Sequence, residues 1–513
     1  MVNQNPHNRS EDLGFPLYMT FCAVIAALSG FNVGWHISVP NMPQTVITKC
    51  SAGTEYYNGL PSCLPMSDFT WGFTVGAFAL GGLFGSFITT YSNVKFTRRH
   101  NIMISCCWFI LGGILSATSI NIGMYSVGRA FVGIGAGMCG SSVAIYVSEI
   151  STKKSRGALG SLFELFLNLG ILLTQVIGRY MSYPPVWRVL WAIPSIIAAI
   201  QLVVLLIFTV ECPRRLCADG KADEARAALQ RLRKGADIDS EYQALLDARQ
   251  REVESNTKKM TIFDIILCKD RSVTWNTVIV MVIQASNQIG GIGPMSVYSV
   301  NFLAGVFGGD LELGTNISIA NATANIVATF IAVIFMHKVG RKGFMVISTF
   351  GMTVACVFLV IGSAAYPGTQ RLAPLSITAA ILFTFTYSMG CGVIPWLIAP
   401  ELLPLAALPP GSALGNASNW LFNFIINTVW PYQDANLGNY SFTVFAAINF
   451  LIFLFVLFCM PETTGKDLDQ KKHQNPNDTE GAHGAAGSSE ASHSFTDDTE
   501  RKVENVHHIE DAH

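Results

Sequence analysis

Charge is scarce in this sequence. Only 13% of its 513 residues are Asp, Glu, Lys or Arg, whereas 50% are hydrophobic. A soluble protein carries about 25% charged residues, so we expect an integral membrane protein in contact with a lipid bilayer. The formal net charge is −1, which excludes the strongly basic surface that a nucleic-acid partner requires.

Signatures of catalysis and of metal binding are also missing. The 12 cysteines form no CxxC pair and no Cys/His spacing of the zinc type. No nucleophile–base pair and no phosphate-binding loop stands out. We therefore expect no enzymatic activity, no metal and no cofactor. Most cysteines lie in apolar runs, but Cys50 and Cys63 lie in a polar loop and can form a disulfide if that loop faces an oxidising compartment.

Apolar runs long enough to cross a bilayer are present instead. A spanning helix needs roughly 20 residues, and hydropathy indicates twelve such runs, the first of which we expect to be retained as a signal anchor. The runs are 16–38, 69–91, 101–120, 123–147, 157–180, 187–210, 273–305, 316–337, 343–365, 374–399, 411–432 and 441–460. The predicted fold class is all-α integral membrane, with twelve transmembrane helices in two six-helix halves and an intracellular helical linker.

The same pattern predicts the domain organisation and the orientation. The predicted domains are a cytoplasmic N-terminal segment (1–15), an N-terminal half (16–210), a cytoplasmic helical linker (211–272), a C-terminal half (273–460) and a mostly disordered cytoplasmic tail (461–513). Lys and Arg gather in the loops after the second, fourth and eighth runs, which places those loops in the cytoplasm. An even number of spans then puts both termini in the cytoplasm and the Cys50/Cys63 loop outside.

The sequence also repeats itself. KFTRRH (95–100) and KVGRKG (338–343) follow the second and eighth runs, and YVSEI and IAPEL close the fourth and tenth. The offset is 243 residues from Arg98 to Arg341, 252 from Glu149 to Glu401 and 251 from Glu211 to Glu462. Three motifs that recur at a near-constant offset indicate two parallel halves, as in transporters whose halves rock about a central site.

These repeated charges lie at helix ends, where they could hold the two halves together on one side. Exposed ion pairs are worth about 0–1 kcal/mol each, so such a latch could be broken readily. The alternative is that the basic residues only mark the cytoplasmic side. The candidate gating residues are Arg98, Arg99, Glu149, Arg156, Glu211, Arg214, Arg341, Glu401 and Glu462.

Polar side chains within the apolar runs mark a candidate pathway. Glu164, Asn168 and Gln175 fall on one helical face, and Asn287 and Gln288 precede a glycine-rich stretch that should kink its helix. Further polar or aromatic candidates in later runs are Asn325, Trp396, Asn416, Asn419, Trp420 and Asn423. Amides with few charges suit a neutral polyol, although any single Asn could instead make only a helix–helix hydrogen bond.

The motifs taken together resemble one known family. They are GFNVGWHISVP (30–40), GRAFVGIGAG (128–137), YVSEI (146–150), RGALG (156–160), ECPRRL (211–216), IPW (394–396), SNW (418–420) and PETTG (461–465). In combination they are similar to sugar porters of the major facilitator superfamily, especially the facilitative glucose transporters, over nearly all of 16–466. The resemblance implies hexose transport by alternating access, with sugar contacts at Glu164, Asn287, Gln288, Asn325, Trp396, Asn419 and Trp420.

The sequence departs from that family at several of these positions. Glu164 stands where the family usually has Gln, Asn287 replaces the first residue of a Gln-Gln pair, and Gly293 replaces an Asn. Ser388 occupies a position that is usually acidic or polar. Thr97 replaces the glycine before the first Arg-Arg pair, and the loop between the tenth and eleventh runs lacks its usual Arg.

Two residues bear on whether transport is facilitated diffusion or proton-coupled, and they leave both modes open. Proton-coupled relatives usually carry an Asp where this chain has Asn32, which favours facilitated diffusion. Glu164 could be a permanently neutral Gln mimic, because burial disfavours the charged form, or a titrating group that couples protons to sugar. Other hypotheses are a carrier of inositol or quinate and a non-transporting sugar sensor. We expect a monomer that binds a small-molecule sugar, in the plasma membrane or alternatively a vacuolar membrane.

Overall fold

The computed structural model describes residues 13–50, 55–152, 154–254, 260–364, 373–404 and 406–463. Within these residues, ten helical segments are long and apolar enough to cross a membrane. Two further helices, α16 (Leu311–Val339) and α20 (Leu408–Leu437), have 29 and 30 residues and complete the twelve predicted spans. The predicted all-helical, multi-pass membrane fold is confirmed.

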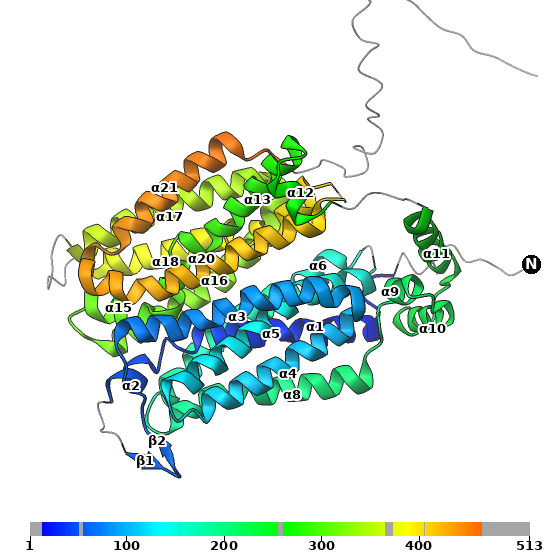
Figure 1. The fold of residues 1–513 in the computed structure, drawn as a ribbon. Helices are drawn as coiled ribbons and strands as arrows, with labels where there is room; N and C mark the ends of the chain where they lie inside the picture. The colour runs from blue at the N-terminus through cyan, green and yellow to red at the C-terminus, as the bar shows by residue number, and fades with distance from the viewer. Residues whose placement is uncertain are drawn as a thin grey trace, which may run out of the picture. The chain divides into compact units, whose positions relative to one another are not determined.

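The N-terminal half contains six spans (Figure 1). They are α1 (Leu17–Ser38), α3 (Asp68–Lys95), α4 (Arg98–Ala117), α5 (Ile122–Ile150), α7 (Leu162–Met181), which follows the short α6 (Arg156–Gly160), and α8 (Val189–Phe208), which follows the 3-10 turn η2 (Val186–Arg188). Between α1 and α3 lie α2 (Gln44–Lys49) and the antiparallel strands β1 (Tyr56–Tyr57) and β2 (Leu60–Pro61). We call the end of the bundle that carries α2 and this hairpin the hairpin end.

Four short helices follow the first half, and the second six spans come after them. The connecting helices are α9 (Pro213–Ala218), α10 (Ala222–Leu232), α11 (Asp239–Glu254) and α12 (Ile262–Ile266). The second half contains α13 (Arg271–Ile289), α14 (Ile292–Val297), α15 (Ser299–Val306), α16, α17 (Arg341–Ala364), α18 (Ala373–Met389), α19 (Ile394–Leu402), α20, the 3-10 turn η4 (Gly438–Tyr440) and α21 (Phe442–Cys459). The end that carries α9–α12 lies opposite the hairpin end and is called the linker end (Figure 1).

Glycines allow helix backbones to touch in the N-terminal half. A Cβ atom at Gly34 on α1 would lie 1.9 Å from the carbonyl oxygen of Leu167 on α7. A Cβ atom at Gly133 on α5 would lie 1.9 Å from the carbonyl oxygen of Phe78 on α3. Small residues at such contacts let membrane helices pack closely. This matters because the hydrophobic effect contributes little to helix association in lipid, and van der Waals packing must stabilise the contact instead. These two helix pairs therefore depend on glycine.

Two spans of the C-terminal half are broken near their middle. The predicted kink in the seventh span is confirmed: α13 ends at Ile289 and α14 begins at Ile292, with Gly291 between them at φ 101°, a conformation that favours glycine. The tenth span is interrupted between Met389 of α18 and Ile394 of α19. Breaks at this depth expose backbone groups and are tolerated where the backbone is buried in protein or lines a cavity.

The two halves meet mainly along two helix pairs. α20 packs against α3, and α16 packs against α7. At the first contact, Gly76 of α3 faces the side chains of Thr428 and Phe424 on α20. The polar residues predicted for the pathway lie on α7, α13, α16 and α20.

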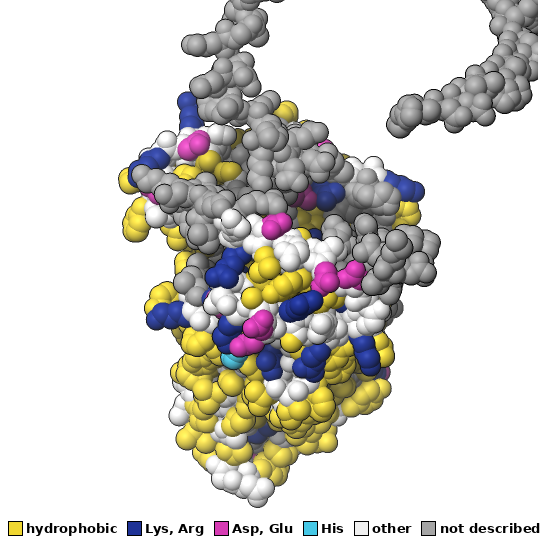
Figure 2. Space-filling model, turned by 90° about the vertical axis from the view of Figure 1, so that its right-hand side faces the viewer, with side chains coloured by type: hydrophobic (Ala, Val, Ile, Leu, Met, Phe, Trp, Pro, Cys, Tyr) yellow, Lys and Arg dark blue, Asp and Glu magenta, His cyan; other side chains and the backbone are white. Residues whose placement is uncertain are grey.

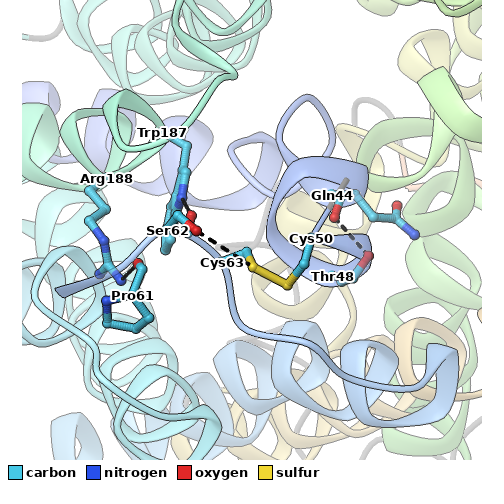
Figure 3. Close-up of a disulfide and its surroundings, with 8 residues drawn as sticks. All are labelled: Gln44, Thr48, Cys50, Pro61, Ser62, Cys63, Trp187 and Arg188. Carbon is cyan, nitrogen blue, oxygen red and sulfur yellow. Dashed lines mark hydrogen bonds between the residues drawn. A yellow bond between two sulfur atoms is a disulfide. The ribbon is translucent and has the colours of Figure 1, made fainter. Parts of the chain in front are cut away.

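A disulfide joins Cys50 to Cys63 at the hairpin end (Figure 3). The hairpin is also held by the N-terminal half, because Trp187 donates from Nε1 to the carbonyl oxygen of Ser62 at 2.8 Å. Arg188 donates from Nη2 to the carbonyl oxygen of Pro61 at 2.7 Å. The loop between the first two spans is thus tied to the start of α8.

Candidate functional site

Amide side chains from α13 and α20 form a connected network. Gln288 donates from Nε2 to Oδ1 of Asn287 at 2.6 Å and to Oδ1 of Asn419 at 3.3 Å, and it accepts from Nδ2 of Asn423 at 2.9 Å. Asn419 in turn donates to Oδ1 of Asn287 at 3.2 Å. The helix break after Ile289 leaves these groups beside an interruption in α13. The structure therefore brings together three of the predicted sugar contacts: Asn287, Gln288 and Asn419.

Two residues that the sequence analysis did not single out extend this network. Gln284, one turn before Gln288, donates to the carbonyl oxygen of Pro395 at 2.8 Å and accepts from Asn419 at 3.2 Å. Tyr387 accepts from Nδ2 of Asn287 at 2.9 Å through its hydroxyl oxygen. Helical spacing from Gln288 could have identified Gln284, whereas a tyrosine in an apolar run gives no such signal.

A second polar cluster joins the two halves beside α18. Asn168, which is 3% exposed, lies 3.5 Å from Oε1 of Glu164 and 3.4 Å from the hydroxyl of Thr329 on α16. Asn325 accepts from the hydroxyl of Ser388 at 2.8 Å and from that of Thr329 at 3.4 Å. Glu164 and Asn325, predicted from different halves, thus belong to one chain of hydrogen-bonded side chains.

The two predicted tryptophans have different surroundings. Trp420 lies where α20 meets α3, with its ring 5.8 Å from that of Phe78 and against Gly82. Trp396, in the first turn of α19, is 46% exposed. Its neighbour Pro395 accepts the hydrogen bond from Gln284, so this turn begins beside the amide network.

Polar bonds also join the halves at the hairpin end. Asn41, just after α1, donates to the hydroxyls of Ser299 and Ser318 at 2.9 and 3.0 Å. Its Oδ1 accepts from the backbone N–H of Val300 at 3.1 Å. Ser318 donates to Oε1 of Gln175 on α7 at 2.5 Å. These side chains are buried, and they cross from the first half to the second.

A charged pair lies at the rim of the same end. Arg179 at the end of α7 donates from Nη2 to Oε1 of Glu312 on α16 at 2.7 Å, and it also contacts Asn316. Below this rim, a small cavity of about 10 Å³ is lined by Gln175, Ser318 and Asn325 among others. That is space for roughly one water molecule. At the hairpin end the two halves are therefore in direct polar contact beside the candidate site.

The charges at the linker end form matching pairs within each half. Glu149 at the end of α5 lies 3.9 Å from Arg98 at the start of α4. Glu401 at the end of α19 lies 2.9 Å from Arg341 at the start of α17. The repeat seen in the sequence is thus a repeat in geometry. Both pairs join helices of one half, so a latch between the halves remains a prediction.

The second glutamate of each repeat caps a helix. Glu211 accepts from the backbone N–H of Arg99 at 3.3 Å, and Glu462 accepts from the backbone N–H groups of Arg341 and Lys342, each at 3.1 Å. A carboxylate is favoured there because the first N–H groups of a helix lack intrahelical partners and carry partial positive charge. These glutamates fix the start of α4 and of α17.

The remaining basic residues of the predicted gate are placed separately. Arg99 donates to the carbonyl oxygens of Leu205 and Leu206 at the end of α8, both at 2.8 Å. Arg156 begins α6 and Arg214 lies on α9, and both are exposed. Figure 2 shows basic and acidic side chains mixed on this face, with hydrophobic side chains predominating below them.

The chemistry available at the site is that of hydrogen bonding. The two clusters offer amides and hydroxyls, with Glu164 as the carboxyl group, and such groups both donate and accept. Within the described residues, no group of three or more His, Cys, Asp or Glu side chains is arranged to hold a metal ion. The arrangement suits recognition of a neutral, hydroxyl-rich molecule.

Comparisons with known proteins agree with this description. A model of the family described as "Sugar (and other) transporter" matches residues 22–473. Solute carrier family 2, facilitated glucose transporter member 3 of Oryctolagus cuniculus is 29% identical over 462 residues, which cover 88% of this chain and 91% of the relative. The member 1 protein of Gallus gallus is 29% identical over 454 residues, covering 87% and 91%.

Solved structures with the same fold include the xylose transporter XylE from E. coli. Its partially occluded inward open conformation has a TM-score of 0.71 and 21% identity, covering 88% of this chain and 100% of that chain. The structure of the major facilitator superfamily proton:xylose symporter XylE bound to 6-bromo-6-deoxy-D-glucose has a TM-score of 0.69 and 20% identity, covering 89% and 98%. At this identity the likeness concerns the fold alone.

Proposed function

Because the chain belongs to the sugar (and other) transporter family and has the major facilitator fold, we propose that it carries a hexose such as glucose across a membrane by facilitated diffusion. The observation that carries this proposal is the amide network of Asn287, Gln288 and Asn419 beside the break in α13. Uncharged donors and acceptors match the hydroxyls of a neutral sugar. The relatives named as facilitated glucose transporters support a hexose as the substrate class.

Transport proceeds by alternating access between two halves, 16–210 and 273–460, joined by the linker 211–272. The bonds of Asn41, Gln175 and Arg179 between the halves close the hairpin end, whereas the Arg98–Glu149 and Arg341–Glu401 pairs stay within their halves. Opposite ends of a rocking transporter open in turn around a fixed central site. The bonds at the hairpin end support a state in which access from that end is closed.

The functional unit is a monomer in the plasma membrane, with the linker end, both termini and the tail 461–513 in the cytoplasm. The disulfide at the hairpin end supports this orientation, because disulfides persist on the oxidising side of a membrane. The protein acts as a carrier, with no enzymatic step and no cofactor. The remaining contacts to the sugar come from Glu164, Asn325, Trp396 and Trp420.

Proton-coupled symport through Glu164 is the second candidate. Its supporting observation is that this carboxyl group lies 3.5 Å from Asn168, whose amide reaches Thr329 in the other half. A proton gained or lost at Glu164 would change its bond to Asn168, the residue that contacts the other half. The presence of Asn32 in place of an Asp favours the uniport.

A competition experiment tests the substrate class. Purified protein in lipid nanodiscs is loaded with radiolabelled glucose, and unlabelled glucose, galactose, inositol and quinate are tested as competitors. We expect hexoses to displace the label and the anionic quinate to fail, because the two clusters offer no Lys or Arg side chain. Displacement by inositol or quinate in preference to hexoses would contradict the proposal. Binding without uptake into liposomes would indicate a sensor instead.

A further inference from the structure

The short helix α12 and Leu267, which follows it, expose large apolar side chains outside the spans. Phe263 is 73% exposed, Ile266 60% and Leu267 69%, although they lie in the connecting segment and not in a membrane-crossing helix. Ile265, on the same helix, is buried instead and packs against Val273 and Ala407. An exposed apolar cluster of this kind marks an interaction surface.

This surface continues onto a membrane-crossing helix. The hydroxyl of Thr274 on α13 donates to the carbonyl oxygen of Ile265 at 3.1 Å, which fixes α12 beside the first turns of α13. On α13 itself, Trp275 is 49% exposed and Val278 37%. Tryptophan is enriched where a spanning helix crosses the membrane–water interface. The exposed face of α12 is thus continuous with the lipid-facing face of α13.

A groove of about 720 Å³ lies on this face. It is lined by Cys268, Arg271, Ser272, Thr274, Trp275 and Val278. Its apolar wall is formed by Trp275 and Val278, and its polar end by Arg271, whose side chain is exposed. A molecule that fits both ends has a hydrocarbon chain and an anionic group.

The charged side chains next to Arg271 have partners of their own, so Arg271 supplies the positive charge of the groove. Lys269 pairs with Asp264, and this bond together with those from Thr261 holds the pKa of Asp264 well below its usual range. The carboxylate of Asp270 accepts from the backbone N–H of Ser272 at 2.9 Å and caps α13. Both carboxylates near the groove are therefore committed to other partners.

We propose that α12 lies in the interface of the adjacent leaflet and that a membrane phospholipid occupies the groove, with its phosphate at Arg271 and an acyl chain along Trp275 and Val278. The continuity of the groove with the lipid-facing surface and the charge complementarity at Arg271 select this occupant. The tail 464–513 is a poorer match, because it has few large apolar residues. The inference rests on the membrane fold and is independent of the transported substrate.

The depth of α12 is measured with spin labels on the full-length protein in lipid nanodiscs. Exposed Cys107 and Cys268 are replaced by Ser, as is Cys459, and a label is attached at Ile266→Cys or, as a control, at exposed Lys234→Cys on the linker. The label at Ile266 should be more accessible to oxygen than to a water-soluble nickel chelate, and the label at Lys234 the reverse. Equal nickel accessibility at both positions would overturn the interfacial placement.

The occupant of the groove is identified with a photoreactive amino acid at Val278, again in the full chain. Mass spectrometry after illumination should find a phospholipid adduct. This adduct should fall about threefold to fivefold in Arg271→Ala, as for loss of an exposed charge pair. It should persist in Arg271→Lys and in the control Arg226→Ala, an exposed arginine on α10. An adduct with the tail 464–513, no lipid adduct, or an undiminished adduct in Arg271→Ala would overturn the proposal.

Discussion

The two halves follow the same six-helix plan but are packed differently. In the N-terminal half, glycines such as Gly34 and Gly133 bring helix backbones into contact. In the C-terminal half the closest backbone approaches are longer: a Cβ atom at Gly390 would lie 2.5 Å from the carbonyl oxygen of Phe344. Gly351 and Gly362 of α17 face the side chains of Thr386 and Ser376. The two broken spans that position the site also belong to this half. The glycine contacts hold the spans of the first half close together, and the interruptions place the candidate binding groups in the second half.

What the halves share is the charged cluster at the linker end. Arg98 with Glu149 and Arg341 with Glu401 occupy equivalent positions, and Glu211 and Glu462 each cap the helix that the arginine begins. The repeated part of the sequence thus holds each half together, whereas the amide network that we propose as the sugar site lies in a part that is not repeated.

The largest effect should come from filling a close glycine contact in the N-terminal half. Gly133→Ala places a methyl group 1.9 Å from the carbonyl oxygen of Phe78, so α3 and α5 must separate, at a cost of about 1–3 kcal/mol. A thermal-shift assay on the purified protein should show a clearly lowered melting temperature. Gly140→Ala on the same helix is the control, because a Cβ atom there meets nothing within 4 Å. Equal stability of the two variants would show that the packing is not tight.

A binding variant in the C-terminal half should leave stability intact and reduce uptake. Gln288→Ala removes the central amide of the network, and the loss of one or two hydrogen bonds to substrate should weaken sugar binding about tenfold. Gln433→Ala, which removes a similarly buried glutamine bonded to the carbonyl oxygen of Ser441 at the hairpin end, is the matched control. Equal affinities of these two variants for glucose would show that the network is not part of the sugar site.

Substitution of Glu164 tests whether the N-terminal half contributes a proton-binding site. If this residue is a neutral Gln mimic, Glu164→Gln should change glucose uptake by less than about twofold and leave its dependence on pH as it is in the unmodified protein. Uptake by both proteins is measured in liposomes over a pH series. A pH dependence that is present in the unmodified protein and absent in the variant would assign the group to proton coupling.

The smallest effect is expected at the rim of the hairpin end. Arg179→Ala or Glu312→Ala breaks an exposed pair worth about 0.2–1 kcal/mol. Opening toward that end should therefore rise by less than about fivefold. Labelling of a cysteine at Asn325 by a membrane-impermeant reagent reports this opening. Exchanging the two charges should restore the original rate, and failure of that exchange would show that the pair does not hold the halves.

The sequence was informative where the signal is local. Apolar runs predicted the spans, and polar residues inside them predicted Asn287, Gln288 and Asn419, because a polar group at that depth needs a partner. Contacts between segments far apart could not be predicted in this way. Asn41 reaches Ser299 and Ser318, which are 258 and 277 residues away, and ordinary serines in apolar runs give no signal. Whether the ion pairs at the linker end join helices of one half or of both halves likewise depends on tertiary packing.

Uptake of labelled glucose into proteoliposomes, with and without an inward proton gradient, tests the central claim most directly. Facilitated diffusion predicts that glucose equilibrates across the membrane at the same level under both conditions, and that Gln288→Ala slows this uptake. Accumulation above equilibrium only when the gradient is present would contradict the uniport, and absence of any glucose uptake by the unmodified protein would contradict the proposed function itself.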